Sequence, residues 1–109
     1  MKGWLIVAPF LNANVNAIAL FPFILLRKDA MRNDEVLLNH ERIHLRQQAE
    51  LLILPFYVLY LLNYLINLAR YNKHYQAYCN ISFEREAYDQ EKDMGYLSRR
   101  KWYNWLAYF

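Results

Sequence analysis

The chain has 109 residues and a net charge of +3, and 57% of its residues are hydrophobic. This length provides one modest hydrophobic core, and a content of only two glycines argues against a turn-rich all-β fold. The basic residues form short groups beside apolar runs rather than a long stripe, which argues against nucleic-acid binding and suits an anionic membrane surface. Cys79 is the single cysteine, so a reducing compartment fits. We therefore expect a cytoplasmic protein, either free or held at the membrane.

The N-terminal third is apolar but unsuited to a long helix. Pro9 and Pro22 interrupt it, and asparagines alternate with apolar residues over positions 12–17. A period of two predicts extended chain, and proline suits turns and edge strands. We expect one or two short strands, the better one around Ala17–Leu26, followed by a polar turn.

A long helix is expected next. Asn33 or Asp34 can cap it, and it should run to about Leu54, where Pro55 kinks or ends it. The following residues, 51–69, form the most apolar stretch of the chain.

Two short C-terminal helices complete the expected fold. Ser82 should cap a helix over Phe83–Met94 that Gly95 ends, and Ser98 should cap a last aromatic helix. The expected fold class is α+β and mainly α, in a single compact domain spanning 1–109, with short N-terminal strands packed on the long helix.

The long helix carries the sequence HERIH, which matches the pattern H-E-x-x-H. Residues four apart share one face of a helix, so His40 and His44 can reach one metal ion while Glu41 stands beside its open position. There Glu41 could hold a metal-bound water and accept its proton. A helical wheel places both histidines on the apolar, inward-facing stripe. The other members of this stripe are Leu37, Gln47 and Leu51.

A third ligand must come from further along the chain. The candidates are His74, Glu84 and Glu86. His74 lies in a mixed stretch without a clear face, which favours a surface or hydrogen-bonding role. On a wheel of the helix after Ser82, Glu86 lies on a polar, solvated side, whereas Glu84 lies towards the apolar side. Its inward direction favours Glu84 as the ligand.

These motifs resemble those of gluzincin-type zinc metallopeptidases. H-E-x-x-H followed by E-x-x-A-D on a second helix is their pattern, and Glu84-Arg85-Glu86-Ala87-Tyr88 aligns with the second part. The resemblance covers about Ala17 to Tyr88 and is greatest to the membrane-associated branch that includes CAAX-processing proteases and antibiotic-sensor peptidases, and to the minimal "minigluzincins".

The resemblance implies one Zn²⁺ per chain, bound by His40, His44 and Glu84, with Glu41 as the general base in the hydrolysis of a peptide or protein substrate. It also implies that the segment before the long helix is the active-site strand. Two positions depart from the pattern. Arg42 is charged where the family residue is usually uncharged, and Tyr88 replaces the aspartate that orients a ligand histidine. Tyr88 could accept the same N–H, with less effect on the basicity of the ligand.

The apolar stretch 51–69 is long enough, at about 28 Å as a helix, to cross a bilayer. A single crossing would separate His44 from Glu84 by roughly 30 Å, which a shared metal ion forbids. Either the stretch folds back, as core or as a hairpin at the membrane surface, or the metal site does not exist. The alternative function is a non-catalytic, membrane-associated or protein-interaction module with a relict or structural metal site. Neither the oligomeric state nor the substrate follows from the sequence.

Overall fold

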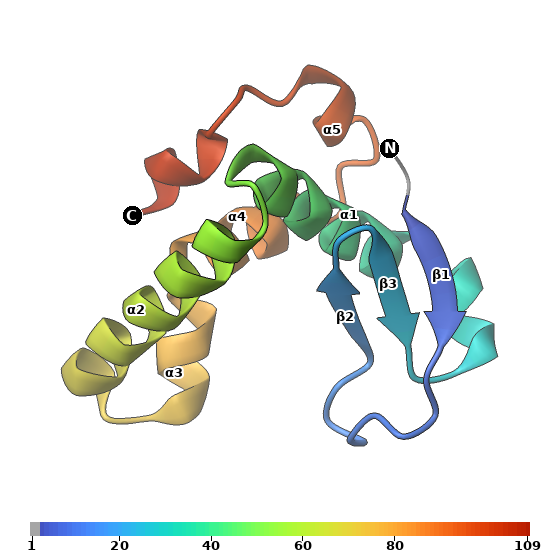
Figure 1. Cartoon of the computed structure of the whole chain (residues 1–109), viewed down its shortest axis with the longest axis horizontal. Helices are drawn as coiled ribbons and strands as arrows, with labels where there is room; N and C mark the ends of the chain where they lie inside the picture. The colour runs from blue at the N-terminus through green and yellow to red at the C-terminus, as the bar shows by residue number, and fades with distance from the viewer. Residues whose placement is uncertain (1–2) are drawn as a thin grey trace.

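The computed structural model describes residues 3–109 and has the expected α+β, mainly helical architecture. A small sheet forms one side of the molecule, a pair of helices forms the other, and a central helix joins them (Figure 1). The elements in chain order are β1 (Trp4–Val7), β2 (Ala17–Leu20), β3 (Phe23–Leu26), the 3₁₀ helix η1 (Asp29–Asn33), α1 (Glu35–Glu50), α2 (Leu54–Tyr71), α3 (His74–Cys79), α4 (Ser82–Gln90), α5 (Tyr96–Arg99) and the 3₁₀ helix η2 (Asn104–Tyr108).

The sheet has the strand order β1-β3-β2, with β1 parallel and β2 antiparallel to β3. The stretch Ala17–Leu26 is therefore a hairpin of two strands, and a third strand comes from the apolar run near the N-terminus. Ile24 and Leu26 of β3 are fully buried and pack with Leu38 and Leu45 of α1. The strand order makes β3 the central strand and leaves β1 and β2 at the edges.

Helix α1 begins where the sequence predicts, but it ends earlier. The Asp34 side chain caps it by accepting a hydrogen bond from the Leu37 backbone N–H at 3.1 Å. The helix ends at Glu50, because Leu52 and Ile53 adopt positive φ angles of 57° and 71° and turn the chain. Pro55 then lies in the first turn of α2, a position where its missing N–H costs nothing. The expected end near Leu54 was wrong for this reason.

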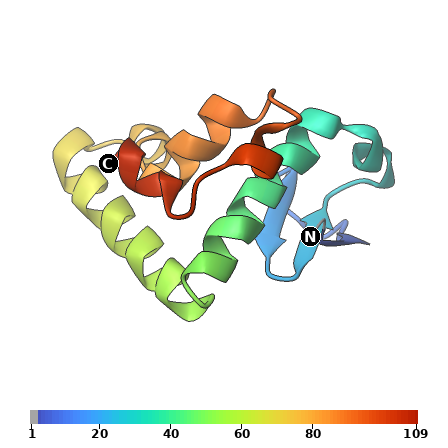
Figure 2. The ribbon, with the colours of Figure 1, turned by 90° about the horizontal axis from the view of Figure 1, so that it is seen from above.

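The apolar stretch folds back, as a metal site requires. Helices α1 and α2 are bent by 112° relative to each other, and Figure 2 shows the resulting V seen from above. Within residues 3–109, no one helix has both the length and the apolar character to cross a membrane; α1 and α2 would do so only as this bent pair. The chain then returns through α3, so that α4 packs against α1.

The C-terminal third differs from its predicted boundaries. Helix α4 ends at Gln90 rather than Met94. Ser82 does not cap it; its buried hydroxyl donates instead to the Trp105 carbonyl oxygen. Ser98 lies inside α5, and the last aromatic stretch forms η2 rather than an α-helix. Trp105 of η2 is buried in an apolar cluster with Phe56, Ile81 and Phe83, which packs η2 against α4.

A buried ionic network ties residues 96–109, called here the C-terminal segment, to the helices. The Arg100 guanidinium donates to Glu50 of α1 at 2.7 Å and 3.1 Å, and to Glu86 of α4 at 3.1 Å. Glu86 is fully buried and also accepts from the Tyr96 hydroxyl. The prediction of a solvated Glu86 was therefore wrong, since its partners come from a segment distant in sequence.

The network yields a prediction about stability. Arg100→Ala would leave two buried carboxylates without their cation, so we expect the free energy of unfolding to fall by about 3–5 kcal/mol. Arg99→Ala is the matched control. Arg99 pairs with Asp93 at the surface, and such pairs contribute about 0–1 kcal/mol. Urea unfolding followed by circular dichroism measures both, and equal losses would contradict the role given to Arg100.

Candidate metal centre

His40, Glu41 and His44 lie on the face of α1 that turns towards the space between β2 and α4. Their exposed fractions are 5–6%, as expected from the apolar stripe on which the sequence places them. Two imidazoles one helical turn apart at such burial need polar partners. Helix α4 provides one, because it packs against α1 and directs Glu84 at both rings.

The three predicted ligands meet. Nε2 of His40 lies 3.2 Å from Oε1 of Glu84, and Nε2 of His44 lies 3.0 Å from the same oxygen. The candidate ligand atoms of the three residues all lie within 4.8 Å of one another, and all three side chains are buried. This group can therefore hold a metal ion.

The geometry and donor types can be compared with those of a zinc site. Ligand atoms about 2.0–2.1 Å from a tetrahedral zinc ion lie about 3.3 Å from each other. The two nitrogen–oxygen distances in this group, 3.2 Å and 3.0 Å, are close to that value. Two imidazoles and one carboxylate are also the donor set of one type of catalytic zinc site, which leaves a fourth position open. The residues present therefore suit such an ion.

Each ligand is oriented by a second hydrogen bond. Nδ1 of His40 lies 2.9 Å from Oε1 of Glu91, and Nδ1 of His44 lies 2.8 Å from Oε1 of Gln47. The second carboxylate oxygen of Glu84 accepts from the Tyr60 hydroxyl at 2.6 Å. Partners of this kind fix the tautomer and the orientation of ligand histidines.

Tyr88 does not have the orienting role expected from the motif. Its hydroxyl is 3.0 Å from that of Tyr78, and its ring packs edge-on against His40 with centroids 4.5 Å apart. Glu91 takes the role instead. The buried amide of Asn39 donates to the backbone carbonyls of Glu91 and Asp93 at 2.8 Å and 3.0 Å, and so holds this turn against α1.

The other two candidates for the third ligand lie elsewhere. His74 is exposed on α3, and its Nδ1 pairs with the Tyr64 hydroxyl at 2.8 Å, which agrees with the hydrogen-bonding role expected for it. Glu86 accepts from Nε2 of Gln47 at 2.9 Å. It therefore supports the site indirectly, through the amide that contacts His44.

The charges of the group are strongly coupled. Burial alone would lower the pKa of His44, but the charge of Glu84 and its hydrogen bond raise it to about 9. Burial would raise the pKa of Glu84, whereas His44 and the hydrogen bonds from both histidines and Tyr60 hold it well below its usual range. For Glu41 burial prevails, and its pKa is raised despite the neighbouring histidines.

The site lies in a cleft of about 1010 Å³. Residues 14–20 form one wall, α1 forms the floor, and side chains of α2, α3 and α4 form the other wall. In the part of the chain that the structure describes, the charged side chains lining this cleft are acidic apart from the histidines: Asp34, Glu41, Glu84 and Glu91.

Sequence reasoning missed three residues of the site. Gln47 had a signal, because it shares the helical stripe of the histidines. Tyr60 and Glu91 had none, since each belongs to an element that reaches the site only through the reversal of the chain.

Comparison with protein-family models, with curated proteins and with solved structures found no match for this sequence.

Metal uptake should be linked to proton release. With a pKa of about 9, His44 carries its extra proton at neutral pH, and a metal can bind only the neutral imidazole. We expect about one proton to be released per metal ion at pH 7, and affinity to weaken about tenfold per pH unit as the pH falls below 9. Calorimetry in buffers of different ionisation enthalpy measures the protons released. His74→Gln is the control and should leave the number unchanged; release of no protons would contradict the coupling.

Glu91 and Tyr88 can be separated experimentally. Glu91→Ala removes the acceptor at Nδ1 of His40, so we expect metal affinity to fall about 10–100-fold. Tyr88→Phe removes only a hydroxyl that pairs with another tyrosine, and affinity should stay within about threefold. Competition with a chromophoric chelator measures both constants. A larger loss of metal affinity in Tyr88→Phe than in Glu91→Ala would show that Tyr88 orients His40, as the motif predicts, and would contradict the role given to Glu91.

Proposed function

We propose that this chain is a zinc-dependent metallopeptidase. The observation that carries the proposal is the placement of Glu41. Its carboxyl group is buried directly beside the three-ligand group and lines the same open cleft. A site that only stabilised the fold would need four ligands and no cleft.

His40, His44 and Glu84 would hold the ion. Zinc bound there would polarise a substrate carbonyl and lower the pKa of a water molecule. The protein contributes a ligand set already oriented by Gln47, Glu91 and Tyr60, which reduces the rearrangement needed during the reaction.

Glu41 would accept the proton of the attacking water and pass it to the leaving amine. Its raised pKa, caused by burial, makes it a better base than an exposed glutamate. A hydrogen bond from the Ala19 backbone N–H also holds the carboxylate between β2 and α1.

Strand β2 supports a peptide as substrate. It is an edge strand of the sheet and lines the cleft. Backbone groups alternate in direction along a strand, so Ala17 directs its N–H and C=O to the same outer edge as Ala19, whose carbonyl accepts from Gln48 at 2.9 Å. Both outer groups of Ala19 already have partners, Glu41 for the N–H and Gln48 for the C=O, so an extended peptide would form its main-chain hydrogen bonds with Ala17.

Tyrosines on the opposite wall supply donors for the oxyanion. Tyr75 and Tyr78 both line the cleft. Burial and the charge of Glu84 raise the pKa of Tyr78, so its hydroxyl stays protonated at neutral pH. The Tyr60 hydroxyl already donates to Glu84. The Tyr78 hydroxyl pairs with that of Tyr88, so Tyr78 would donate to the oxyanion with Tyr88 as the donor of their shared hydrogen bond.

Glu41→Gln tests the proposal. We expect the variant to bind one zinc per chain, as the wild type does, and to lose peptide hydrolysis by about 10²–10⁴-fold, because only the proton acceptor is removed. Glu35→Gln, an exposed change on the same helix, should leave hydrolysis intact. The readouts are elemental analysis of the purified protein and mass spectrometry of a random peptide library after incubation.

Two outcomes would contradict the proposal. Wild-type protein that binds zinc but leaves the whole library uncleaved would favour the non-catalytic module. Hydrolysis that persists in Glu41→Gln would exclude Glu41 as the base. Metal should also be lost in His40→Ala and in Glu84→Ala.

A further inference from the structure

Helix α2 turns its two asparagines and most of its aromatic residues inwards and its aliphatic residues mainly outwards. Six aliphatic side chains form its outer face, with exposed fractions of 49–71%. These are Leu54, Val58, Leu61, Leu62, Leu65 and Ile66, and the positions recur at three- and four-residue spacing along one stripe. A helix on the surface of a protein in water normally presents the opposite arrangement.

The inner face of α2 carries the amides. The Asn67 side chain is 4% exposed and donates to the Ala77 carbonyl oxygen at 3.1 Å. Oδ1 of Asn63 accepts from the Ser82 backbone N–H at 2.9 Å. These hydrogen bonds fix the rotation of the helix about its axis, so the outer face cannot turn inwards without breaking them. The apolar stripe is therefore a property of the fold.

The stripe continues at one end of the helix and is bounded by charge at the other. Leu52, in the turn before α2, is 82% exposed. At the C-terminal end, Arg70 and Lys73 are both exposed, and the sequence from 51 to 73 contains no acidic residue. A contiguous exposed apolar surface marks an interaction site, and the charged residues that this segment places at its end, Arg70 and Lys73, are both basic.

We propose that α2 docks on an anionic lipid bilayer, with its axis in the plane of the membrane surface. The outer face would enter the boundary between headgroups and acyl chains, to a depth of about 5–10 Å. Arg70 and Lys73 would contact lipid phosphates. A second copy of the chain is the less suitable occupant, because this segment offers its own basic end no acidic partner.

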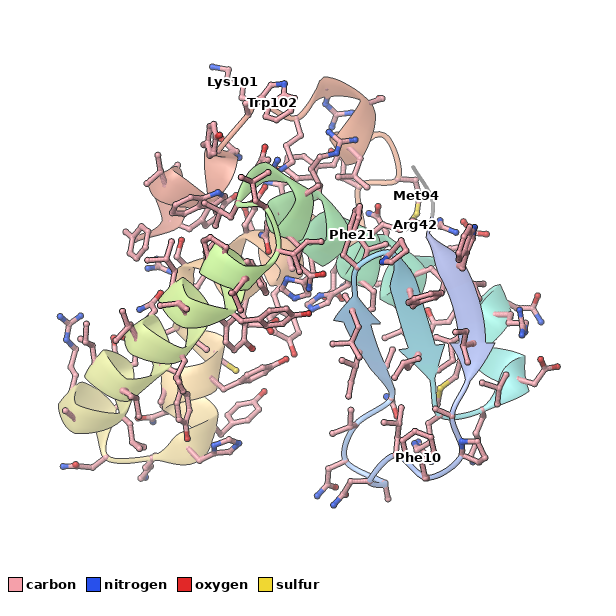
Figure 3. All side chains as sticks on the ribbon, viewed as in Figure 1. Phe10, Phe21, Arg42, Met94, Lys101 and Trp102 are labelled. Carbon is pink, nitrogen blue, oxygen red and sulfur yellow. The ribbon has the colours of Figure 1, made fainter. Side chains whose placement is uncertain are left out.

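The C-terminal segment also combines an exposed apolar side chain with a basic one. Lys101 and Trp102 project away from the helices (Figure 3), and Trp102 is 74% exposed. Tryptophan beside a basic residue suits headgroup depth. The opposite face of α2 carries Tyr60, which contacts Glu84, so docking would place the metal group about one helix diameter, ~10 Å, from the membrane surface.

Sedimentation of the full-length protein with extruded vesicles tests the docking. We expect binding to vesicles of 30% phosphatidylglycerol in phosphatidylcholine, and at least tenfold weaker binding to phosphatidylcholine alone. Leu62→Gln/Leu65→Gln/Ile66→Gln should lower the partition coefficient at least tenfold. The matched control changes three exposed apolar residues off the helix to Gln: Ile6, Phe10 and Met94. It should retain binding within about threefold.

The charge requirement has its own test. Arg70→Gln/Lys73→Gln should weaken binding to the anionic vesicles by about 25-fold, at roughly fivefold per charge. The control pair Lys28→Gln/Lys92→Gln lies away from the helix and should change it by less than about threefold.

Several results would overturn the proposal. One is wild-type protein that stays in the supernatant with anionic vesicles. Another is an equal loss of binding in the apolar variant and its control. A third is a wild-type dimer, measured by light scattering, that becomes monomeric when the outer face is changed, because the face would then be an interface between copies. Far-ultraviolet circular dichroism serves as the folding control, so these outcomes are independent of the proposed metal site and hydrolysis.

Discussion

The structure depends on the contact between one carboxylate oxygen and two imidazoles. Glu84 of α4 meets His40 and His44 of α1 although at least forty residues separate them in the sequence. Three buried ionisable side chains are costly unless they neutralise each other or share a metal ion. The chain must therefore reverse after α1, and it does so at Leu52 and Ile53, whose positive φ angles are unfavourable for side chains of this size. The burial of α1 against the sheet and α4 offsets that strain.

The metal group and the C-terminal segment belong to one polar network. Gln47 lies between them: its oxygen contacts His44, and its amide nitrogen donates to Glu86. Glu86 in turn accepts from Arg100, which also donates to Glu50. Because each of these side chains is buried, each depends on its neighbours for hydrogen bonds. The orientation of a ligand histidine is thus connected to a residue near the end of the chain.

Helix α2 separates two environments. On its inner face, the Tyr60 hydroxyl donates to the Glu84 carboxylate. Phe56 on the same face packs in an aromatic core with Phe83 and Trp105. Its outer face is aliphatic and exposed. A predominantly apolar helix therefore forms a wall of the cleft on one side and an exposed aliphatic face on the other. The acidic lining of the cleft and the basic border of the outer face keep the two surfaces chemically distinct.

Periodicity and local chemistry in the sequence were enough to predict the existence of α1, its start after Asn33 or Asp34, and the inward direction of His40, His44 and Glu84. These are helical properties that depend on residues three or four apart. Element ends and the outer partners of the site were decided only by the tertiary structure. The sequence predicted a solvated Glu86, but in the folded chain Glu86 is buried and accepts a hydrogen bond from Arg100. Glu91 orients His40 because Asn39 holds the chain after α4 against α1. Likewise, the exposed aliphatic face of α2 follows from the inward amides of Asn63 and Asn67. These contacts depend on which groups from distant parts of the sequence come close together in the fold, and no local sequence pattern encodes them.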